Sequence, residues 1–361
     1  MKKFFFIAAA AAALMCSCNK EEQPVVNNVD KSEPATITLN LAGSPATKAT
    51  GDVIADTDDE AKVNSIQIFV FNGDVVDAYK KADASEVTAK QVVLQGTVGT
   101  RMIYAFVNAP DLSSYTSKTA LLASVTSLAD NAANSYVMSG KTAELTVSAD
   151  FETTINVDRY VSRIRIHKIT RKMASDGALK TATFKVNRIY LTSAVTNETY
   201  GFGKPAAYTW TNVSFGTGSR ALATDNAFVY QSVAGENIAD GSSLTQTFSF
   251  YALPNTNASD DNAAQSAQTY RRTRLVVECI VNRGNGNEYF TYPVAMPAME
   301  SNKSYELNEL VITILGNPSD GDDDADDGED QDIDKINETV KIVVNDWTEV
   351  LVGNDQGVFT I

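Results

Sequence analysis

The stretch Ala35-Thr36-Ile37-Thr38-Leu39-Asn40-Leu41 (residues 35–41) decides how this sequence folds. Its apolar and polar residues alternate without a break, so Ile37, Leu39 and Leu41 share one face of an extended chain. A period of two residues is the signature of a β-strand with one buried face. The sequence therefore predicts a half-buried strand near the N-terminus, whose apolar face must be covered by the rest of the protein.

Strand patterns also dominate the remainder of the chain, and only residues 119–133 have the apolar spacing of a helix. Many strands with little helix are typical of β-sandwiches and argue against alternating α/β units. A length of 361 residues fits two domains better than one. The predicted strands are 63–71, 91–98, 102–108, 143–149, 152–169, 184–191, 246–253, 273–282, 287–295, 304–315, 339–352 and 357–361.

The N-terminal segment has the pattern of an export signal. Two lysines are followed by an 11-residue apolar run, residues 4–14, which is too short to span a bilayer. The run ends in LMCSC, and the small residue before Cys18 resembles a bacterial lipobox. We therefore expect residues 1–17 to be removed and Cys18 to carry the lipid; an ordinary signal peptide with two incidental cysteines is the alternative.

Composition argues against enzymes and against nucleic-acid binding. The chain has a formal net charge of −15 and a single histidine, His167, and it lacks the usual phosphate-loop, serine-hydrolase and zinc motifs. The alternation of residues 163–167 places His167 with Arg163 and Arg165 on a polar face, which predicts a basic surface stripe. Cys279 lies within an apolar run and is expected to be a buried strand residue. We expect no catalytic residue and no cofactor.

An acidic segment, residues 319–334, holds ten acidic residues and no basic residue. Such a charge run favours a solvated, flexible loop kept open by self-repulsion. A calcium loop needs carboxylates at defined offsets and a glycine at the sixth position. Asp322, Asp324 and Asp326 supply three of those carboxylates, but the sixth position is Asp327. Weak calcium binding by these three residues remains an alternative to having no metal site.

Seven local patterns, taken in order along nearly the whole chain, resemble the fimbrillin family, the major and minor fimbrial subunits (type V pilins) of Bacteroidales. The lipobox is followed by a strand and then by a basic residue in a loop, although Lys48 stands where this family commonly has an arginine. The patterns are TKA (47–49), SIQIFVFN (65–72), YVMSG (136–140), DRYVSRI (158–164), YALPN (251–255), NKSYEL (302–307) and VVNDWT (343–348).

The resemblance implies an all-β protein with two transthyretin-like β-sandwich domains in tandem, which we place at residues 49–158 and 159–361. Residues 18–48 would form a lipidated propeptide containing the first strand. The family's precursors are outer-membrane lipoproteins that lose this strand to a trypsin-like protease, after which the C-terminal strand of another subunit fills the opened groove. The implied product is a cell-surface fimbrium that supports adhesion to host or bacterial surface ligands.

The residues themselves fit this scheme. Lys48 is the only basic residue between Lys31 and Lys62 and lies among small and turn-forming residues, so we expect cleavage between Lys48 and Ala49. Cleavage there would leave an unpaired strand edge that can accept another strand. The tail, residues 347–361, ends in an apolar strand pattern and is the expected donor, with Trp347, Leu351, Val358, Phe359 and Ile361 as its apolar residues.

Three other functions remain open at the level of sequence. Within the family, the chain could be a tip or accessory adhesin, or an anchor that keeps its lipid and its first strand. Outside the family, it could be a surface lipoprotein that binds glycans through a long aromatic loop containing Tyr200, Phe202, Tyr208 and Trp210. The expected partners are other copies of this chain and related subunits, with no nucleic acid.

Overall fold

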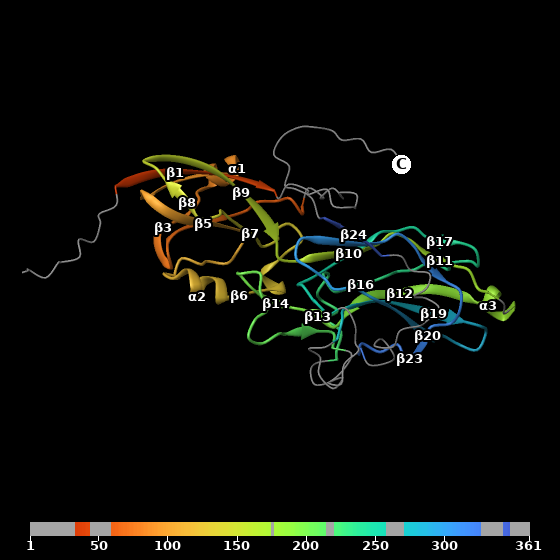
Figure 1. Ribbon diagram of the computed structural model, residues 1–361. Helices are drawn as coiled ribbons and strands as arrows, with labels where there is room; N and C mark the ends of the chain where they lie inside the picture. Colours follow the sequence, from red (N-terminus) through yellow and green to blue (C-terminus); the bar gives the residue numbers. More distant parts are fainter. Residues whose placement is uncertain are drawn as a thin grey trace, which may run out of the picture.

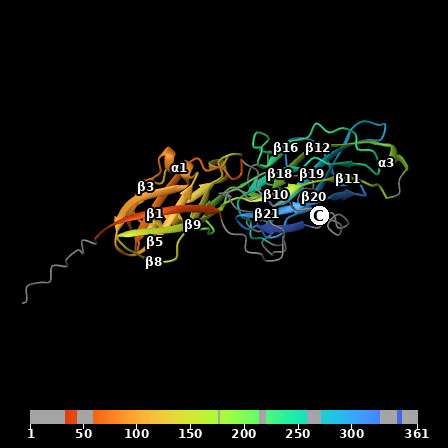
Figure 2. The same cartoon turned by 90° about the horizontal axis from the view of Figure 1, so that it is seen from above.

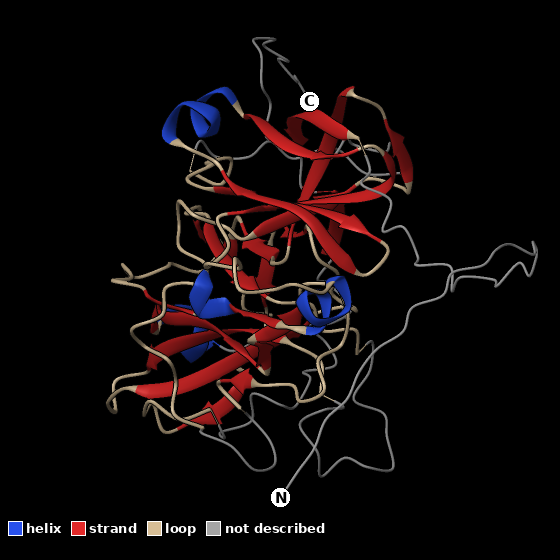
Figure 3. Cartoon of the chain, turned by 90° about the vertical axis from the view of Figure 1, so that its left-hand side faces the viewer, coloured by secondary structure: helices blue, strands red, loops and turns tan. Residues whose placement is uncertain are grey.

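The computed structural model describes residues 33–43, 59–174, 177–213, 220–257 and 271–325, together with the backbone of 342–346. The described chain is built almost entirely of β-strands, with a few short helices at its surface (Figures 1 and 3). The predicted all-β class is therefore confirmed. The signal segment, Cys18, Lys48, Ala49, Asp326 and the tail from Trp347 onward lie outside the described residues.

The first half of the chain forms one sheet of eight strands. Its strand order is β3-β2-β5-β7-β9-β1-β4, and β8 pairs with β5. The sheet curls so that its two ends meet, because Lys80 on β3 donates to the carbonyl of Val93 on β4 and Thr97 donates to Asp77. The strands are β1 (Pro34–Gly43), β2 (Ile66–Asn72), β3 (Val75–Lys81), β4 (Gln91–Thr97), β5 (Gly99–Val107), β7 (Met138–Lys141), β8 (Leu145–Val147) and β9 (Asp150–Arg159).

The second half forms several smaller sheets (Figure 1). Their orders are β18-β10-β21-β24, β17-β11-β22 and β16-β12-β19-β20-β23, and β13 pairs with β15. The strands are β10 (Ser162–Ile166), β11 (Ile169–Arg171), β12 (Thr183–Thr192), β13 (Ala194–Val195), β15 (Trp210–Thr211), β16 (Tyr230–Ser232), β17 (Ser243–Leu244), β18 (Phe248–Ala252), β19 (Arg274–Asn282), β20 (Glu288–Ala295), β21 (Lys303–Leu307), β22 (Leu310–Ile312), β23 (Asn317–Ser319) and β24 (Ile342–Asp346).

Two large apolar cores hold these sheets together. One lies inside the first sheet and includes Ile37, Ile68 and Ile155. The other fills the second half and extends to the opposite face of the first sheet, where it includes Phe69 and Phe106. Successive residues of β2 and β5 thus serve different cores, because neighbouring side chains on a strand point to opposite faces. The two halves are joined by this shared apolar core.

The helical prediction for residues 119–133 is only partly correct. Helix α2 (Lys118–Ala123) ends early, and β6 (Val125–Ser127) follows it and pairs with β14 (Asn197–Thr199), after which comes a 3-10 turn (Leu128–Asp130). A strand pairing with a distant partner therefore overrides the local helical spacing. Two further helices were not predicted, α1 (Ala84–Ala89) and α3 (Gly177–Thr181).

Several strand predictions need refinement. The run 152–169 is broken between β9 and β10, where the chain passes from the first sheet to the second set of sheets. Strand β3 was missed because none of its residues is fully buried, so it carries no alternating pattern; Val75 is 66% exposed. Cys279 is buried on β19 as expected, and burial raises the pKa of its thiol well above the ordinary value.

The predicted basic surface stripe at 163–167 is wrong. Arg163 is fully buried, and its guanidinium contacts Glu60 at 2.6 Å and lies 3.8 Å from Glu306. His167 is partly exposed and its Nε2 lies 2.5 Å from Glu306. The polar face of β10 therefore meets carboxylates brought from residue 60 and from β21, contacts that the local sequence pattern could not show.

The expectation of an open acidic loop is wrong for residues 319–325. The backbone of Leu222 donates to Asp323 and that of Ala325 donates to Arg220, and the side chain of Ala325 is buried. Arg188 binds Asp323 at 2.6 Å while also holding the buried Glu278 at 2.7 Å. A buried guanidinium thus supplies the positive charge that holds the start of this acidic segment on the sheet.

Two findings concern metals and membranes. Among the described residues, no group of three or more His, Cys, Asp or Glu side chains is placed to hold a metal ion, and the backbones of Asp322 and Asp324 are fixed by turn hydrogen bonds. Asp326, the third predicted calcium ligand, lies beyond the described part. No helix in the described part has the length and apolar character needed to cross a membrane.

Candidate functional site

Strand β1 is the feature of the fold with the clearest functional meaning. Its alternating sequence is matched by its burial: Ala35, Ile37, Leu39 and Leu41 point into the core of the first sheet, with Ile37 and Leu39 fully buried. Burial of an Ile or Leu side chain contributes about 1.5–3 kcal/mol. The strand therefore fills a groove that would otherwise expose a large apolar surface to water.

The groove is bounded by two strands that are distant in sequence. Strand β1 pairs antiparallel with β4, from Pro34 opposite Thr97 to Asn40 opposite Gln91. It pairs in parallel with β9, from Thr36 opposite Asp150 to Gly43 opposite Val157. Figure 2 shows β1 lying along β9. Because β1 lies between β4 and β9 in the strand order, its loss would leave both neighbours with an unpaired edge.

The outer face of β1 makes only exposed polar contacts. Asn40 donates to Glu152 on β9 at 2.8 Å and accepts from Gln91 on β4 at 2.8 Å. Gln95 donates to Thr36. These exposed hydrogen bonds help to set the register, but each contributes modestly because water competes for the same groups. The apolar face and the backbone ladder therefore supply most of the affinity of β1 for its groove.

The chain beyond β1 is fixed again at Glu60. The side chain of Glu60 is buried, with Arg163 at 2.6 Å and the hydroxyl of Tyr251 donating to it at 2.6 Å. Arg159 also donates to the backbone carbonyl of Glu60. Both ends of the segment 44–58, which contains Lys48 and Ala49, are therefore held by described structure. A cut within that segment would leave β1 attached to the body only by its place in the groove.

Strand β24, the last strand that the structure describes, also borders this region. Strand β24 runs antiparallel to β21, and its last residue, Asp346, pairs with Lys303. The neighbouring Asn302 donates to Asp158 at the end of β9. The described part of β24 thus ends beside the junction of the two halves, near the end of β9 that pairs with Gly43 of β1. The tail residues Trp347, Leu351, Val358, Phe359 and Ile361 lie outside the described residues, so their role stays a prediction.

The aromatic loop considered for glycan binding is only partly exposed. Tyr200 is buried and packs edge-on against Phe106 and Tyr160, whereas Phe202 is 42% exposed. Tyr208 and Trp210 contact each other with ring centroids 5.4 Å apart. Tyr200 and Phe202 line a pocket, while Tyr208 and Trp210 do not. The structure therefore separates four residues that the sequence had grouped together.

This geometry defines a class of all-β proteins in which strand β1 is enclosed between two other strands, β4 and β9. Residues 35–215, half of the chain, match the family of the major fimbrial subunit protein (FimA), and the chain belongs to this family. The matched segment begins at β1. The family consists of fimbrial subunits, so the chain is assigned to cell-surface fimbriae and to assembly with other fimbrial subunits, not to an enzyme class.

Solved structures share the fold. A candidate cell adhesion protein from Bacteroides eggerthii has 18% identity and a TM-score of 0.60, over 88% of this chain and 97% of that one. A second, from Parabacteroides distasonis, has 16% identity and a TM-score of 0.58, over 87% and 96%. A fimbrilin (FimA) from Porphyromonas gingivalis has 16% identity and a TM-score of 0.52, over 87% and 97%. The search of curated proteins found no match.

Proposed function

We propose that this chain is a structural subunit of a surface fimbrium that polymerises by strand exchange. One observation carries the proposal: β1 supplies buried apolar side chains to a groove between β4 and β9, and the only basic residue between Lys31 and Lys62 follows it. Cleavage between Lys48 and Ala49 would free β1. The open groove would then bind the tail of another subunit, which restores the ladder and the core.

In this proposal the chain is first made as a lipoprotein precursor. Residues 1–17 direct export, and Cys18 carries the lipid that holds the precursor in the outer membrane. Residues 18–48 form the propeptide with β1, and the two sandwich domains meet near residues 158–159, where β9 ends and the chain leaves the first sheet. Groove and tail are different surfaces, so the contact is heterologous and can repeat into a filament.

The donor in this scheme is the segment 347–361, with Trp347, Leu351, Val358, Phe359 and Ile361 as candidates for the positions that Ile37, Leu39 and Leu41 vacate. We propose that part of the acidic segment acts as a hinge that lets the tail leave its own domain. Since residues 319–325 are docked on the sheet, any such hinge is confined to residues 326–341. Shortening that segment should then block polymerisation.

The test compares three forms of the full chain in cells that carry the processing machinery. Lys48→Gln should block cleavage, whereas Lys31→Gln, which removes the basic residue before β1, should not. Removal of residues 347–361 should allow cleavage but prevent fibres. The readouts are N-terminal sequencing, which should start at Ala49, and electron microscopy of the cell surface. Wild-type fibres whose subunits still carry a lipidated Cys18 and β1 would contradict the proposal and support an anchor.

A tip or accessory role is the second candidate, because the family resembled by the sequence includes minor as well as major fimbrial subunits. An accessory subunit would be cleaved at Lys48 and would accept a donor tail, yet the chain alone would form no long fibres. Labelling of the chain along the whole fibre supports the structural role, and labelling confined to one end supports the accessory role.

A further inference from the structure

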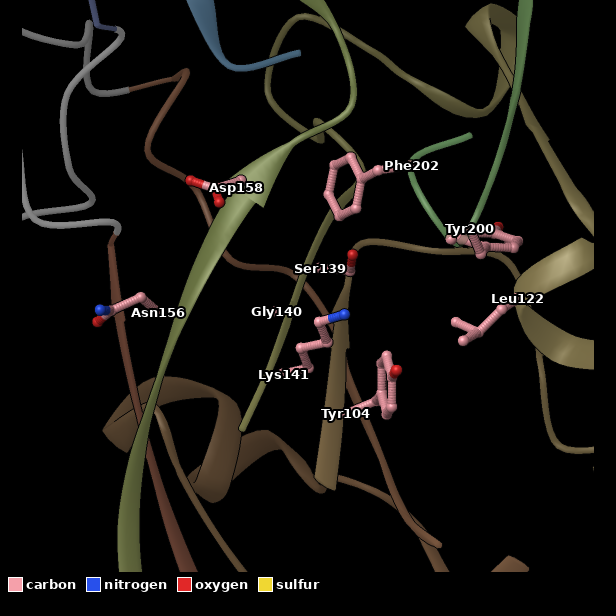
Figure 4. Close-up of a pocket in the computed structure, with 10 residues that line it drawn as sticks. Tyr104, Leu122, Ser139, Gly140, Lys141, Asn156, Asp158, Tyr200 and Phe202 are labelled. Carbon is pink, nitrogen blue, oxygen red and sulfur yellow. The ribbon is translucent and has the colours of Figure 1, made fainter. Parts of the chain in front are cut away.

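A pocket on the outer face of the first sheet has no part in the strand exchange proposed above. Its volume is about 340 Å³, at the lower end of the range for small-molecule sites. Its floor comes from β5, β7 and β9, and its wall from the loop 199–203 and Leu122 of α2. Figure 4 shows Asn156 and Asp158 on one side of this space, with Phe202 and Tyr200 across from them.

The loop that carries Phe202 is built to hold an aromatic ring in place. Phe202 has a φ of 55°, a left-handed backbone that glycine adopts by default and that is strained for a bulky residue. The turn is closed by hydrogen bonds between Thr199 and Gly203 and by the backbone of Phe202 donating to Thr199. Such strain persists where surrounding structure enforces it, and it is concentrated at functional sites.

The ring of Phe202 is supported by a second aromatic ring. It stacks on Tyr160 with ring centroids 4.4 Å apart and an interplanar angle of 11°, yet the residue remains 42% exposed. Tyr160 is itself locked, because its hydroxyl bonds Ser139 at 2.6 Å and donates to the carbonyl of Tyr200 at 2.8 Å. The exposed aromatic surface at the pocket is therefore rigid, and a ligand would lose little energy in ordering it.

The side of the pocket formed by β7 and β9 is polar and balanced in charge. Asn156 offers both a donor and an acceptor, Asp158 offers acceptors, and Lys141 offers donors. Asp158 is oriented by Asn302, which donates to it at 2.8 Å. One carboxylate and one ammonium give no net charge, so the pocket does not select an anion or a cation. Mixed donors and acceptors suit a neutral ligand with several hydroxyl groups.

The close approach of β7 and β9 shapes the floor. A Cβ atom at Gly140 would lie 1.9 Å from the carbonyl oxygen of Asn156, so only glycine fits between these strands. The ladder between β7 and β9 ends just before this contact, since its last pair is Ser139 opposite Asp158. The pocket is thus lined by this junction of β7 and β9 together with Tyr104 of β5.

We infer that this pocket binds a single sugar ring of a neutral saccharide. A pyranose has a C–H face that packs on an aromatic ring and hydroxyls that both donate and accept hydrogen bonds. Phe202 would meet the C–H face, while Asn156, Asp158 and Lys141 would bind the hydroxyls. The inference extends the proposed fimbrial role by naming a ligand class for adhesion, but the binding needs neither cleavage nor polymerisation.

The experiment is saturation-transfer NMR on the unassembled full chain, with the methyl glycosides of glucose, galactose, mannose, fucose and N-acetylglucosamine as probes. At least one glycoside should receive saturation at its ring protons. Phe202→Gly deletes the ring yet suits the backbone, and should weaken binding about tenfold. Asn156→Ala, at an exposed residue, should also weaken binding, while Phe202→Tyr should keep it.

The matched control is Tyr208→Ala, because Tyr208 belongs to the same aromatic stretch but does not line the pocket. It should bind the glycoside as the wild type does. The inference is overturned if none of the five glycosides receives saturation, if Phe202→Gly and Asn156→Ala bind as the wild type does, or if only Tyr208→Ala loses binding. A failure of cleavage or of fibre formation leaves this result unaffected, so the two proposals can fail separately.

Discussion

Arg163 and Glu60 form a buried ion pair, with Nη1 and Oε2 2.6 Å apart and side chains 0% and 2% exposed. The two residues are 103 positions apart. Glu60 also accepts a hydrogen bond from Tyr251 of β18. Arg163, on β10, donates to Ser304 of β21 at 2.8 Å. Three strands therefore contribute to holding the chain at Glu60. This pair fixes the chain just beyond the proposed cleavage segment, and it would remain after β1 has left.

Breaking this pair should be costly. Glu60→Gln leaves the buried guanidinium of Arg163 without its nearest negative charge, and such losses are typically 3–5 kcal/mol. We expect the free energy of unfolding, measured by urea denaturation, to fall by about that amount. We also expect trypsin to cleave the Glu60→Gln precursor near residue 60 more readily than the wild-type precursor, because this part of the chain is no longer held in place.

The matched control is the pair of Lys168 and Glu309, whose side chains are 39% and 36% exposed at a distance of 2.8 Å. Exposed pairs contribute about 0–1 kcal/mol, so Glu309→Gln should have a small effect. Equal losses for Glu60→Gln and Glu309→Gln would show that the buried pair does not fix the segment.

The inward face of β1 should determine how firmly the precursor holds its first strand. Ile37→Ala removes a fully buried side chain that fits close to Gly96, and should lower the stability of the precursor by about 2–5 kcal/mol. Thr38→Ala, on the outer face, should change it by less than about 0.5 kcal/mol. If the two variants unfold at the same urea concentration, β1 does not contribute to the core as proposed.

Cys279 should be chemically silent in the folded protein. It is fully buried on β19, so a reagent cannot reach its sulfur. Burial also raises the pKa of its thiol, so the reactive thiolate does not form. We expect iodoacetamide at pH 8 to leave Cys279 unmodified in buffer and to modify it in urea, as read by peptide mass spectrometry. A cysteine placed on the exposed surface by Ser148→Cys should react in both conditions. Equal reaction rates in buffer would contradict the buried assignment.

The local pattern of the sequence was sufficient to predict β1 and its buried face, because alternation in Ile37, Leu39 and Leu41 is a property of one segment. It was not sufficient to identify β4 and β9 as the partners of β1, since pairing depends on residues far along the chain. Arg163 shows the same limit. Its alternation with Ile164 predicted a side chain exposed to solvent, and only the fold brings Glu60 and Glu306 to that side chain.

The pocket illustrates a different limit. The sequence pointed to Tyr200 and Phe202 because they are aromatic and lie in a long loop, but gave no reason to connect them with Asn156 or Asp158. Those residues belong to β9, whose inward residues Ile155 and Val157 carry the visible pattern. The left-handed backbone of Phe202 also leaves no compositional signal, because positive φ is expected of glycine or asparagine.

Glu198 should give the folded protein an unusual dependence on pH. It lies on β14, is almost fully buried, and burial raises the pKa of its carboxyl to about 8, opposed by a hydrogen bond from Ser301. An unfolded glutamate loses its proton near pH 4.3. Between these values the unfolded state binds fewer protons than the folded state, so stability falls as pH rises from about 4.3 to about 8 and then levels off.

Glu198→Gln removes this dependence, because the amide stays neutral. The variant should gain stability relative to the wild type as pH rises, by up to a few kcal/mol at pH 8, since one pKa unit corresponds to about 1.4 kcal/mol. The control is Glu288→Gln at an exposed site, where Arg283 lowers the pKa of Glu288, so the difference between this variant and the wild type changes only at acidic pH. Urea denaturation at pH 4, 6 and 8 measures both variants. A Glu198→Gln difference that is constant across the three pH values would mean that Glu198 is ionised in the folded protein, and the carboxylate would then need a partner beyond Ser301 to remain buried.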